Sequence, residues 1–331
     1  MTAARITSPG NVEILDVYDS PVTERDVLVR VYASGICGTD VHIFRGDYMG
    51  SYPIIPGHEF AGVVEAVGSS VSRIGVGDRV AIEPNVACDN CHACLNNRQN
   101  FCENWNGIGV TLPGGMAELV AVPEKAVFDI GALPFPVAAF VEPLACVLHG
   151  VERARFRLGD RVLIVGAGPI GILLTKMILL QGAFEITQVD KNKNRLALAQ
   201  GSGASHVLSS VDSVKEEAFD VVVDATGVPS LMERTLGFAR YGGTILLFGV
   251  PPQKSTVTFP AFPIFRKGLT ILSSFTSVRN SVQAVRLLSS GAIDVSSLVS
   301  HTLPLKDLRA GLNLMETGND GALKVQISPN A

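Results

Sequence analysis

The sequence carries little charge and has no block of basic residues. Charged residues make up 18% of the 331 residues, and the formal net charge is -4 at pH 7. Nucleic acids and anionic membrane surfaces attract proteins through clustered positive charge, so we expect neither as a partner. Apolar residues make up 47% of the chain, which is enough for a globular fold. The function is therefore expected to involve a small molecule.

Targeting and membrane-spanning patterns are also missing. Arg5, Ser8 and Pro9 lie where a secretory signal would have its apolar core, which predicts a cytoplasmic protein. The apolar stretch 170–180 contains Gly171 and Lys176 and is shorter than the roughly 20 residues of a membrane span. We therefore predict no membrane span.

Two patterns of secondary structure divide the chain, and its length suits two domains. Between residue 12 and about residue 127, short β-forming runs alternate with glycine-rich turns, which is typical of a β-barrel or partly open sandwich. After Pro134, apolar runs such as 161–165 alternate with segments of helical length, which predicts a doubly wound parallel sheet. Pattern alone assigns the last segment, from about residue 275, to neither domain.

A glycine loop follows the predicted strand 161–165 and opens a predicted helix. Gly166, Gly168 and Gly171 have the spacing of the dinucleotide-binding fingerprint, in which the helix N-terminus faces the pyrophosphate. Asp190 ends the next strand, where an acid accepts the ribose hydroxyls and repels a 2′-phosphate. This favours NAD over NADP, although Lys191 leaves NADP as the alternative. The predicted cofactor contacts are Gly166, Gly168, Pro169, Ile170, Gly171, Asp190, Arg195, Thr226, Gly227, Phe248, Gly249 and Val250.

Four cysteines lie close together in one polar segment. Cys88, Cys91, Cys94 and Cys102 supply four thiolates, which fill a tetrahedral zinc ion without an open position. A nucleic-acid zinc ribbon would show two CxxC pairs about 15 to 20 residues apart and a basic surface. We therefore predict a structural zinc site.

A second set of metal-ligand residue types lies earlier in the chain. Cys37, His42, His58 and Glu59 fall in a short, glycine-rich part of the β region. These residue types suit a catalytic zinc, which keeps one position open for substrate. Spacing alone leaves the alternatives of a core thiol, a turn histidine and a surface acid equally open.

These motifs, in this order, make the chain resemble the zinc-containing medium-chain dehydrogenase/reductase family of alcohol dehydrogenases. The resemblance covers nearly the whole length and includes the segments 37–42, 56–59 and 114–118, the four-cysteine loop and the glycine loop. The segment 141–144, Val-Glu-Pro-Leu, is similar to the polyol (sorbitol) dehydrogenase branch.

The resemblance implies a ligand set for the catalytic zinc. Cys37, His58 and Glu142 are the expected ligands, and Cys146 is the weaker rival of Glu142. Glu59 either ligates the ion or stands just behind it.

The resemblance also implies the architecture and the bounds of the domains. Residues 1–137 form the first part of a GroES-like catalytic domain, with a structural zinc loop at 85–103. Residues 138–274 form a Rossmann NAD-binding domain, and 275–331 complete the catalytic domain. The fold class is α/β, and a homo-oligomer, a dimer or a tetramer, is expected from the habit of the family.

The implied reaction is hydride transfer from a secondary alcohol of a polyol or sugar derivative to NAD, giving the ketone. Zinc acidifies the substrate hydroxyl, and the proton leaves through Thr39, the cofactor ribose and His42. Two zinc ions per subunit are expected, and Asp40 is expected to brace a neighbouring side chain.

Alternative substrates are L-threonine and a sugar or polyol phosphate, for which Arg45 or Arg279 would meet the phosphate. Ile43, Phe44 and Thr276 depart from the animal sorbitol dehydrogenases at positions that contact substrate there. A redox sensor that binds the nucleotide without catalysis is the remaining alternative.

Overall fold

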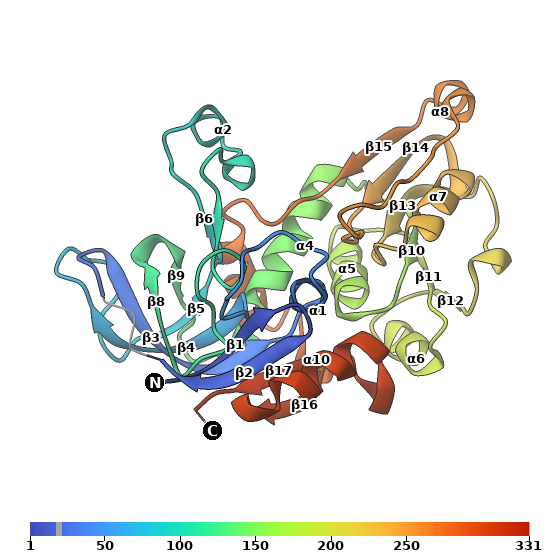
Figure 1. Cartoon of the computed structure of the whole chain (residues 1–331). Helices are drawn as coiled ribbons and strands as arrows, with labels where there is room; N and C mark the ends of the chain where they lie inside the picture. The colour runs from blue at the N-terminus through green and yellow to red at the C-terminus, as the bar shows by residue number, and fades with distance from the viewer. Residues whose placement is uncertain (18–21, 331) are drawn as a thin grey trace. The chain divides into compact units, whose positions relative to one another are not determined.

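The computed structural model describes residues 1–17 and 22–330 of the chain (Figure 1). The chain forms two compact units. The first, called the β unit, comprises Met1–Ala145 and Thr276–Ala331, and the second, called the α/β unit, comprises Cys146–Phe275. The chain passes from the β unit to the α/β unit between Ala145 and Cys146, and it returns at the Phe275–Thr276 bond. The domain bounds predicted from the sequence, 137/138 and 274/275, remain predictions.

A mixed sheet of seven strands forms the core of the β unit. Its order is β16-β17-β3-β4-β5-β9, and β8 also pairs with β3. Alternate side chains of β3 are buried, because successive residues of a strand point to opposite faces. The strands are β3 (Asp26–Gly35), β4 (Glu59–Val67), β5 (Arg79–Ile82), β8 (Leu119–Pro123), β9 (Val127–Asp129), β16 (Val299–Pro304) and β17 (Lys324–Ser328).

Smaller elements complete this unit around the sheet. Strands β1 and β2 form an antiparallel pair, and β6 and β7 form another. These elements are β1 (Thr2–Ser8), β2 (Asn11–Asp16), β6 (Asn85–Val86), β7 (Asn106–Gly107), α1 (Gly38–Arg45), α2 (His92–Leu95), α3 (Phe135–Ala138), α9 (Ser281–Ser289) and α10 (Leu308–Thr317).

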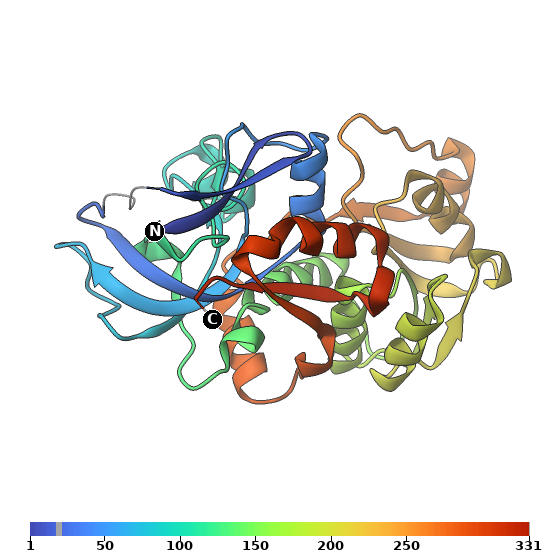
Figure 2. The same ribbon diagram turned by 60° about the horizontal axis from the view of Figure 1, so that its bottom comes forward.

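The C-terminal segment, which pattern alone left unassigned, belongs to the β unit. Strand β17 pairs antiparallel with the end of β3, with Gln326 opposite Gly35. Figure 2 shows this segment, in red, with α10 lying along β17. Leu308 and Leu312 of α10 are buried in a cluster with Ile36, which directly follows β3. Hydrophobic burial therefore attaches the end of the chain to the strand that leads into Cys37.

Hydrogen bonds to Glu83 also hold the C-terminal segment in the β unit. The buried carboxylate of Glu83 accepts hydrogen bonds from Ser277 Oγ at 2.9 and 2.8 Å and from Ser281 Oγ at 2.5 Å. A buried carboxylate needs such donors because burial removes its water. Ser277 and Ser281 follow directly after the chain re-enters the β unit.

The α/β unit is a doubly wound parallel sheet, as predicted. Its six strands have the order β12-β11-β10-β13-β14-β15, and every pairing is parallel. Their runs of buried β-branched residues are typical of a sheet covered on both faces. The elements are β10 (Arg161–Val165), β11 (Glu185–Val189), β12 (His206–Leu208), β13 (Phe219–Asp224), β14 (Ala239–Leu247), β15 (Thr270–Ser273), α5 (Pro169–Leu180), α6 (Lys193–Gly201), α7 (Pro229–Phe238) and α8 (Ala261–Lys267).

One expectation from hydropathy was wrong. The sequence predicted no stretch with the length of a membrane span, but Phe135–Ala154 is long and apolar enough by length and composition. This stretch contains α3 and α4 (Val141–Ala154), and 72% of its apolar window is buried inside the structure. Burial of this kind is typical of a core helix, which passes the same hydropathy test.

Candidate functional site

The β unit brings Cys37, His58 and Glu59 together. One ligand atom from each lies within 4.8 Å of the others. Cys37 follows the end of β3 and caps α1, while Glu59 begins β4. Gly35 and Glu59 are opposite one another in the β3–β4 pair, so the antiparallel register itself juxtaposes the two motifs. A thiolate, an imidazole and a carboxylate are ligand types that zinc takes in proteins, so these residues fit the ion.

Asp40 fixes the geometry of this group, as expected for a bracing residue. Its carboxylate accepts hydrogen bonds from Cys37 N at 2.8 Å and from Gly57 N at 3.2 Å. The same carboxylate lies 3.6 Å from His58 Nδ1. An acid beside the outer nitrogen directs the other ring nitrogen of a histidine toward a metal.

The surroundings of His58 favour positive charge. Burial lowers the pKa of the His58 imidazole, but Asp40 and the Cys37 thiol more than offset this effect, and the pKa is raised well above its ordinary value. The negative charge of Asp40 and Cys37 that raises this pKa also attracts a cation placed among these residues.

Lys324 is a residue of this site that the sequence analysis missed. It begins β17 and is buried, and its Nζ lies 2.9 and 2.6 Å from the two carboxylate oxygens of Glu59. Burial lowers the pKa of Lys324, whereas Glu59, Cys37 and Glu142 raise it, and the net pKa is raised. The ammonium therefore stays charged. A lysine in the otherwise apolar run 322–327 was the available signal, because buried lysines are rare unless paired.

Glu142 lies in the first turn of α4 and is buried. Among the residues that the structure describes, the compact ligand group contains Cys37, His58 and Glu59 but not Glu142. Its charge nevertheless contributes to the raised pKa of Lys324. Glu142 therefore stays a predicted ligand, and so does Glu59.

Helix α1 carries the predicted proton relay. Thr39 and His42 are three residues apart on this helix, so their side chains share one face. His42 Nδ1 lies 2.8 Å from Asp47 Oδ1, a partner that the sequence analysis did not single out. This contact holds the imidazole ring in one orientation.

The four cysteines form a second compact group. The sulfur atoms of Cys88, Cys91, Cys94 and Cys102 all lie within 4.8 Å of one another. Hydrogen bonding to the Asn90 backbone lowers the pKa of the Cys88 thiol to about 6, and burial raises that of Cys94 to about 12. Figure 1 shows this loop around α2, beyond β6. Four thiols in this arrangement fit a closed zinc site.

The glycine loop has the backbone geometry that its fingerprint requires. Gly166 has a φ of +108°, and a Cβ on Gly171 would lie 2.1 Å from Gly166 O. Only glycine fits at both positions. A Cβ on Gly168 would meet nothing within 4 Å, so the loop is open beside the start of α5.

Asp190 directly follows β11 and contacts the glycine loop. Its Oδ2 accepts a hydrogen bond from Ala167 N at 2.8 Å, and its Oδ1 accepts one from Asn192 N at 2.8 Å. Arg195 lies half-buried in the first turn of the helix that follows. The structure therefore places the predicted acid against the loop, at the carboxyl edge of the sheet.

The remaining predicted cofactor contacts lie at the ends of two other strands of this sheet. Asp224 accepts hydrogen bonds from Thr226 N, Thr226 Oγ1 and Gly227 N, and burial raises the pKa of its carboxyl. A Cβ on Gly249 would lie 2.0 Å from Gly227 N. The backbones of the two strand ends therefore pack directly on each other, with Phe248 and Val250 on either side of Gly249.

Most of the residues that the sequence analysis considered as substrate contacts pack against, or form ion pairs with, other residues of the β unit. Ile43 is buried in a cluster with Ile6, Ile54 and Val110, and Phe44 packs against it. The Arg45 guanidinium pairs with Glu316 of α10. Arg279 lies 3.9 Å from Asp89, and Thr276 has a φ of +51°.

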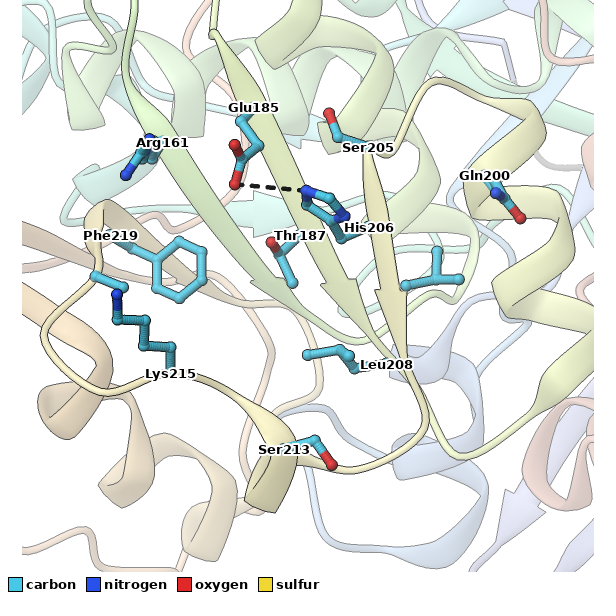
Figure 3. A pocket seen from close by; sticks show the side chains of 12 residues that line it. Arg161, Glu185, Thr187, Gln200, Ser205, His206, Leu208, Ser213, Lys215 and Phe219 are labelled. Carbon is cyan, nitrogen blue, oxygen red and sulfur yellow. Dashed lines mark ion pairs between the residues drawn. The ribbon is translucent and has the colours of Figure 1, made fainter.

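The α/β unit also contains a hollow of about 610 Å³ that includes none of the predicted site residues. It lies beside the amino ends of β10 and β11, where residues 209–218 form only the short helix η3 (Val211–Ser213) before β13 (Figure 3). His206 and Glu185, on the neighbouring strands β12 and β11 that line it, form an ion pair of 3.7 Å. The glycine loop lies at the opposite, carboxyl end of the same strands.

Comparison with known proteins matches both units to families. Residues 23–134 match the alcohol dehydrogenase GroES-like domain, and residues 169–290 match the zinc-binding dehydrogenase family. The chain is 36% identical over 315 residues to the D-altritol 5-dehydrogenase of Agrobacterium fabrum, covering 93% of this chain and 94% of that protein. It is 33% identical to the D-arabinitol dehydrogenase 1 of Uromyces fabae, covering 100% and 97%.

The fold is similar to that of a solved zinc-binding dehydrogenase from Sinorhizobium meliloti with NADP bound. The TM-score is 0.94 and the identity 33%, and the match covers 99% of each chain. The predicted GroES-like and Rossmann folds are thereby confirmed. The chain therefore belongs to the zinc-containing medium-chain alcohol dehydrogenases, in their polyol-dehydrogenase-like branch, and is an oxidoreductase that uses zinc and a nicotinamide cofactor.

Proposed function

We propose that the protein oxidises a secondary alcohol of a polyol or sugar derivative to the ketone and passes the hydride to NAD. The observation that carries this proposal is the compact group of Cys37, His58 and Glu59, of which His58 and Glu59 are buried, in a chain whose relatives include altritol and arabinitol dehydrogenases.

The residues of the β unit have separate tasks in this reaction. Cys37 and His58, with Glu59 or Glu142, would hold zinc, which when bound supplies a Lewis acid for the substrate hydroxyl. The Thr39 hydroxyl would take up the proton of that hydroxyl while giving up its own, and His42 would be the final proton acceptor of the β unit; a bound cofactor would supply the ribose hydroxyls between them. Asp47 orients the His42 ring through its contact with Nδ1. Asp40 keeps the backbone of Cys37 and Gly57 in place.

The finer cofactor assignment is part of the proposal. Two zinc ions per subunit follow from two separate ligand groups. Asp190 at the glycine loop favours NAD, because its carboxylate repels a 2′-phosphate. We further propose a cytoplasmic homo-oligomer, a dimer or a tetramer, that binds neither nucleic acid nor membranes.

The test is reduction of NAD with a panel of alcohols, before and after zinc is removed by a chelator. Polyols are expected to give the highest kcat/KM, and activity should be lost with zinc and return when zinc is added back. Higher kcat/KM with L-threonine or with a sugar phosphate would replace the substrate class. Full turnover by protein shown by elemental analysis to contain no zinc would overturn the mechanism.

A further inference from the structure

Lys324 uses all of its hydrogen-bonding capacity at the predicted catalytic zinc site. Its Nζ lies 2.9 Å from Glu59 Oε1 and 2.6 Å from Glu59 Oε2, and it donates to Ile36 O at 3.2 Å. An ammonium group has three protons, and here it has three acceptors. Both partners are buried, at 3% and 1% exposure, so water does not screen the pair.

The backbone of β3 confines the Glu59 carboxylate on another side. A Cβ on Gly35 would lie 2.2 Å from Glu59 Oε2, so only glycine leaves room for the carboxylate there. Gly35 is opposite Glu59 in the strand pair. The position of Glu59 is therefore set by two elements, β3 and β17.

A cation next to a metal ligand weakens the binding of the metal by that ligand, whereas an anion next to a ligand strengthens it. The Asp40 carboxylate beside His58 makes the imidazole a better metal ligand. The Lys324 ammonium competes with a metal ion for the lone pairs of Glu59, and it also repels the positive charge of the ion. Lys324 should therefore weaken Glu59 as a ligand without moving it away.

We propose that Lys324 is a positioning residue that shares the Glu59 carboxylate with the catalytic zinc and so keeps one coordination position available to the substrate hydroxyl. This inference rests on the zinc site of the proposed function. It assigns to the C-terminal strand β17 a direct part in tuning that site. Loss of the positive charge would make Glu59 a full ligand.

The experiment measures zinc affinity by competition against a chelator in the full-length enzyme. Because two zinc ions are expected, the catalytic zinc is identified as the one that is lost in the Cys37→Ser variant. Lys324→Met should bind this zinc more tightly by about tenfold or more, the usual size of outer-sphere effects, while kcat/KM falls. Lys324→Arg retains the charge and should stay close to the unchanged enzyme. Lys306→Met, at an exposed lysine of the same segment, is the matched control and should alter neither quantity.

A second comparison tests whether Lys324 acts through Glu59. In a Glu59→Gln background, Lys324→Met should change zinc affinity by less than about twofold, because coupled residues show their interaction only when both are present. If Lys324→Met does not fold, Lys324→Gln makes the same comparison, since its side chain carries a hydrogen-bond donor but no charge.

The outcomes separate this inference from the proposed function. Weaker or unchanged zinc binding in the charge-removing variants would overturn the role of Lys324, because a merely orienting residue lowers affinity when it is lost. An equal shift in the Glu59→Gln background would overturn it as well. Absence of a second zinc from the unchanged enzyme would instead remove the proposed function.

Discussion

The two candidate ligands on α4 can be distinguished one residue at a time. Glu142 and Cys146 lie four residues apart on this helix and so share a face. Glu142 is buried, and its charge acts on Lys324, which contacts Glu59. Burying a carboxylate costs free energy unless a positive charge compensates it, and this favours Glu142 over Cys146 as the ligand.

We therefore predict different effects for these two positions. Glu142→Gln should lower the zinc content of the catalytic site and reduce kcat/KM by about tenfold or more. Cys146→Ser should leave both unchanged. Elemental analysis and steady-state kinetics on the two variants measure this, and the reverse pattern would identify Cys146 as the ligand.

Asp190 is the second position where one side chain carries a prediction. Its carboxylate already accepts Ala167 N of the glycine loop at 2.8 Å. Asp190→Ser should lower kcat/KM with NAD relative to NADP by about tenfold or more, because hydrogen bonds to charged groups contribute roughly 1.5–3 kcal/mol each and the repulsion of the 2′-phosphate disappears. The ratio of kcat/KM for the two cofactors is the measurement. Lys193→Ala, at an exposed position of α6, is the control, and an unmoved ratio in Asp190→Ser would remove this residue as the discriminator.

At the scale of elements, the four-cysteine loop contains and adjoins only short helices and strands. It contains α2 of four residues, and the neighbouring strands β6 and β7 have two residues each. Trp105 joins the loop to β6 through a hydrogen bond from Nε1 to Asn85 Oδ1 at 3.0 Å. Elements this short do not hold their conformation alone, so metal binding there contributes directly to folding.

Removal of one ligand tests that role. Cys91→Ser should lose one zinc ion per subunit and lower the Tm by more than about 5 °C, since 1 kcal/mol shifts the Tm of a domain of this size by about 2–4 °C. Trp105 is the single tryptophan of the chain, so its fluorescence should also change. Cys146→Ser is the matched cysteine control. Equal thermal stability of Cys91→Ser and the unchanged protein would contradict a structural zinc at this loop.

Elements of the α/β unit were predictable because their signals are local. The predicted strand 161–165 agrees with β10 at both ends, and the helix predicted after the glycine loop is α5. Strong apolar periodicity and glycine punctuation specify such elements without information from distant residues.

For the whole molecule, the ligand sets show what local sequence can and cannot provide. Cys88 to Cys102 form one loop, so their spacing alone indicated a metal site. Cys37 follows β3 and Glu59 begins β4, so their approach depends on the register of these two strands. The family resemblance supplied that pairing, whereas spacing by itself left the alternatives open.

The sequence by itself determined the fold class, the glycine loop and the four-cysteine loop, because each depends on residues that are near one another in the chain. Only the tertiary structure decided that Lys324 lies against Glu59, 265 residues away, and that Ser277 and Ser281 bind Glu83. The physical reason is that these contacts depend on how β17 pairs with β3 and on how the returning segment packs. Pairing between distant segments is set by the burial and hydrogen bonding of the entire unit, which local periodicity does not encode.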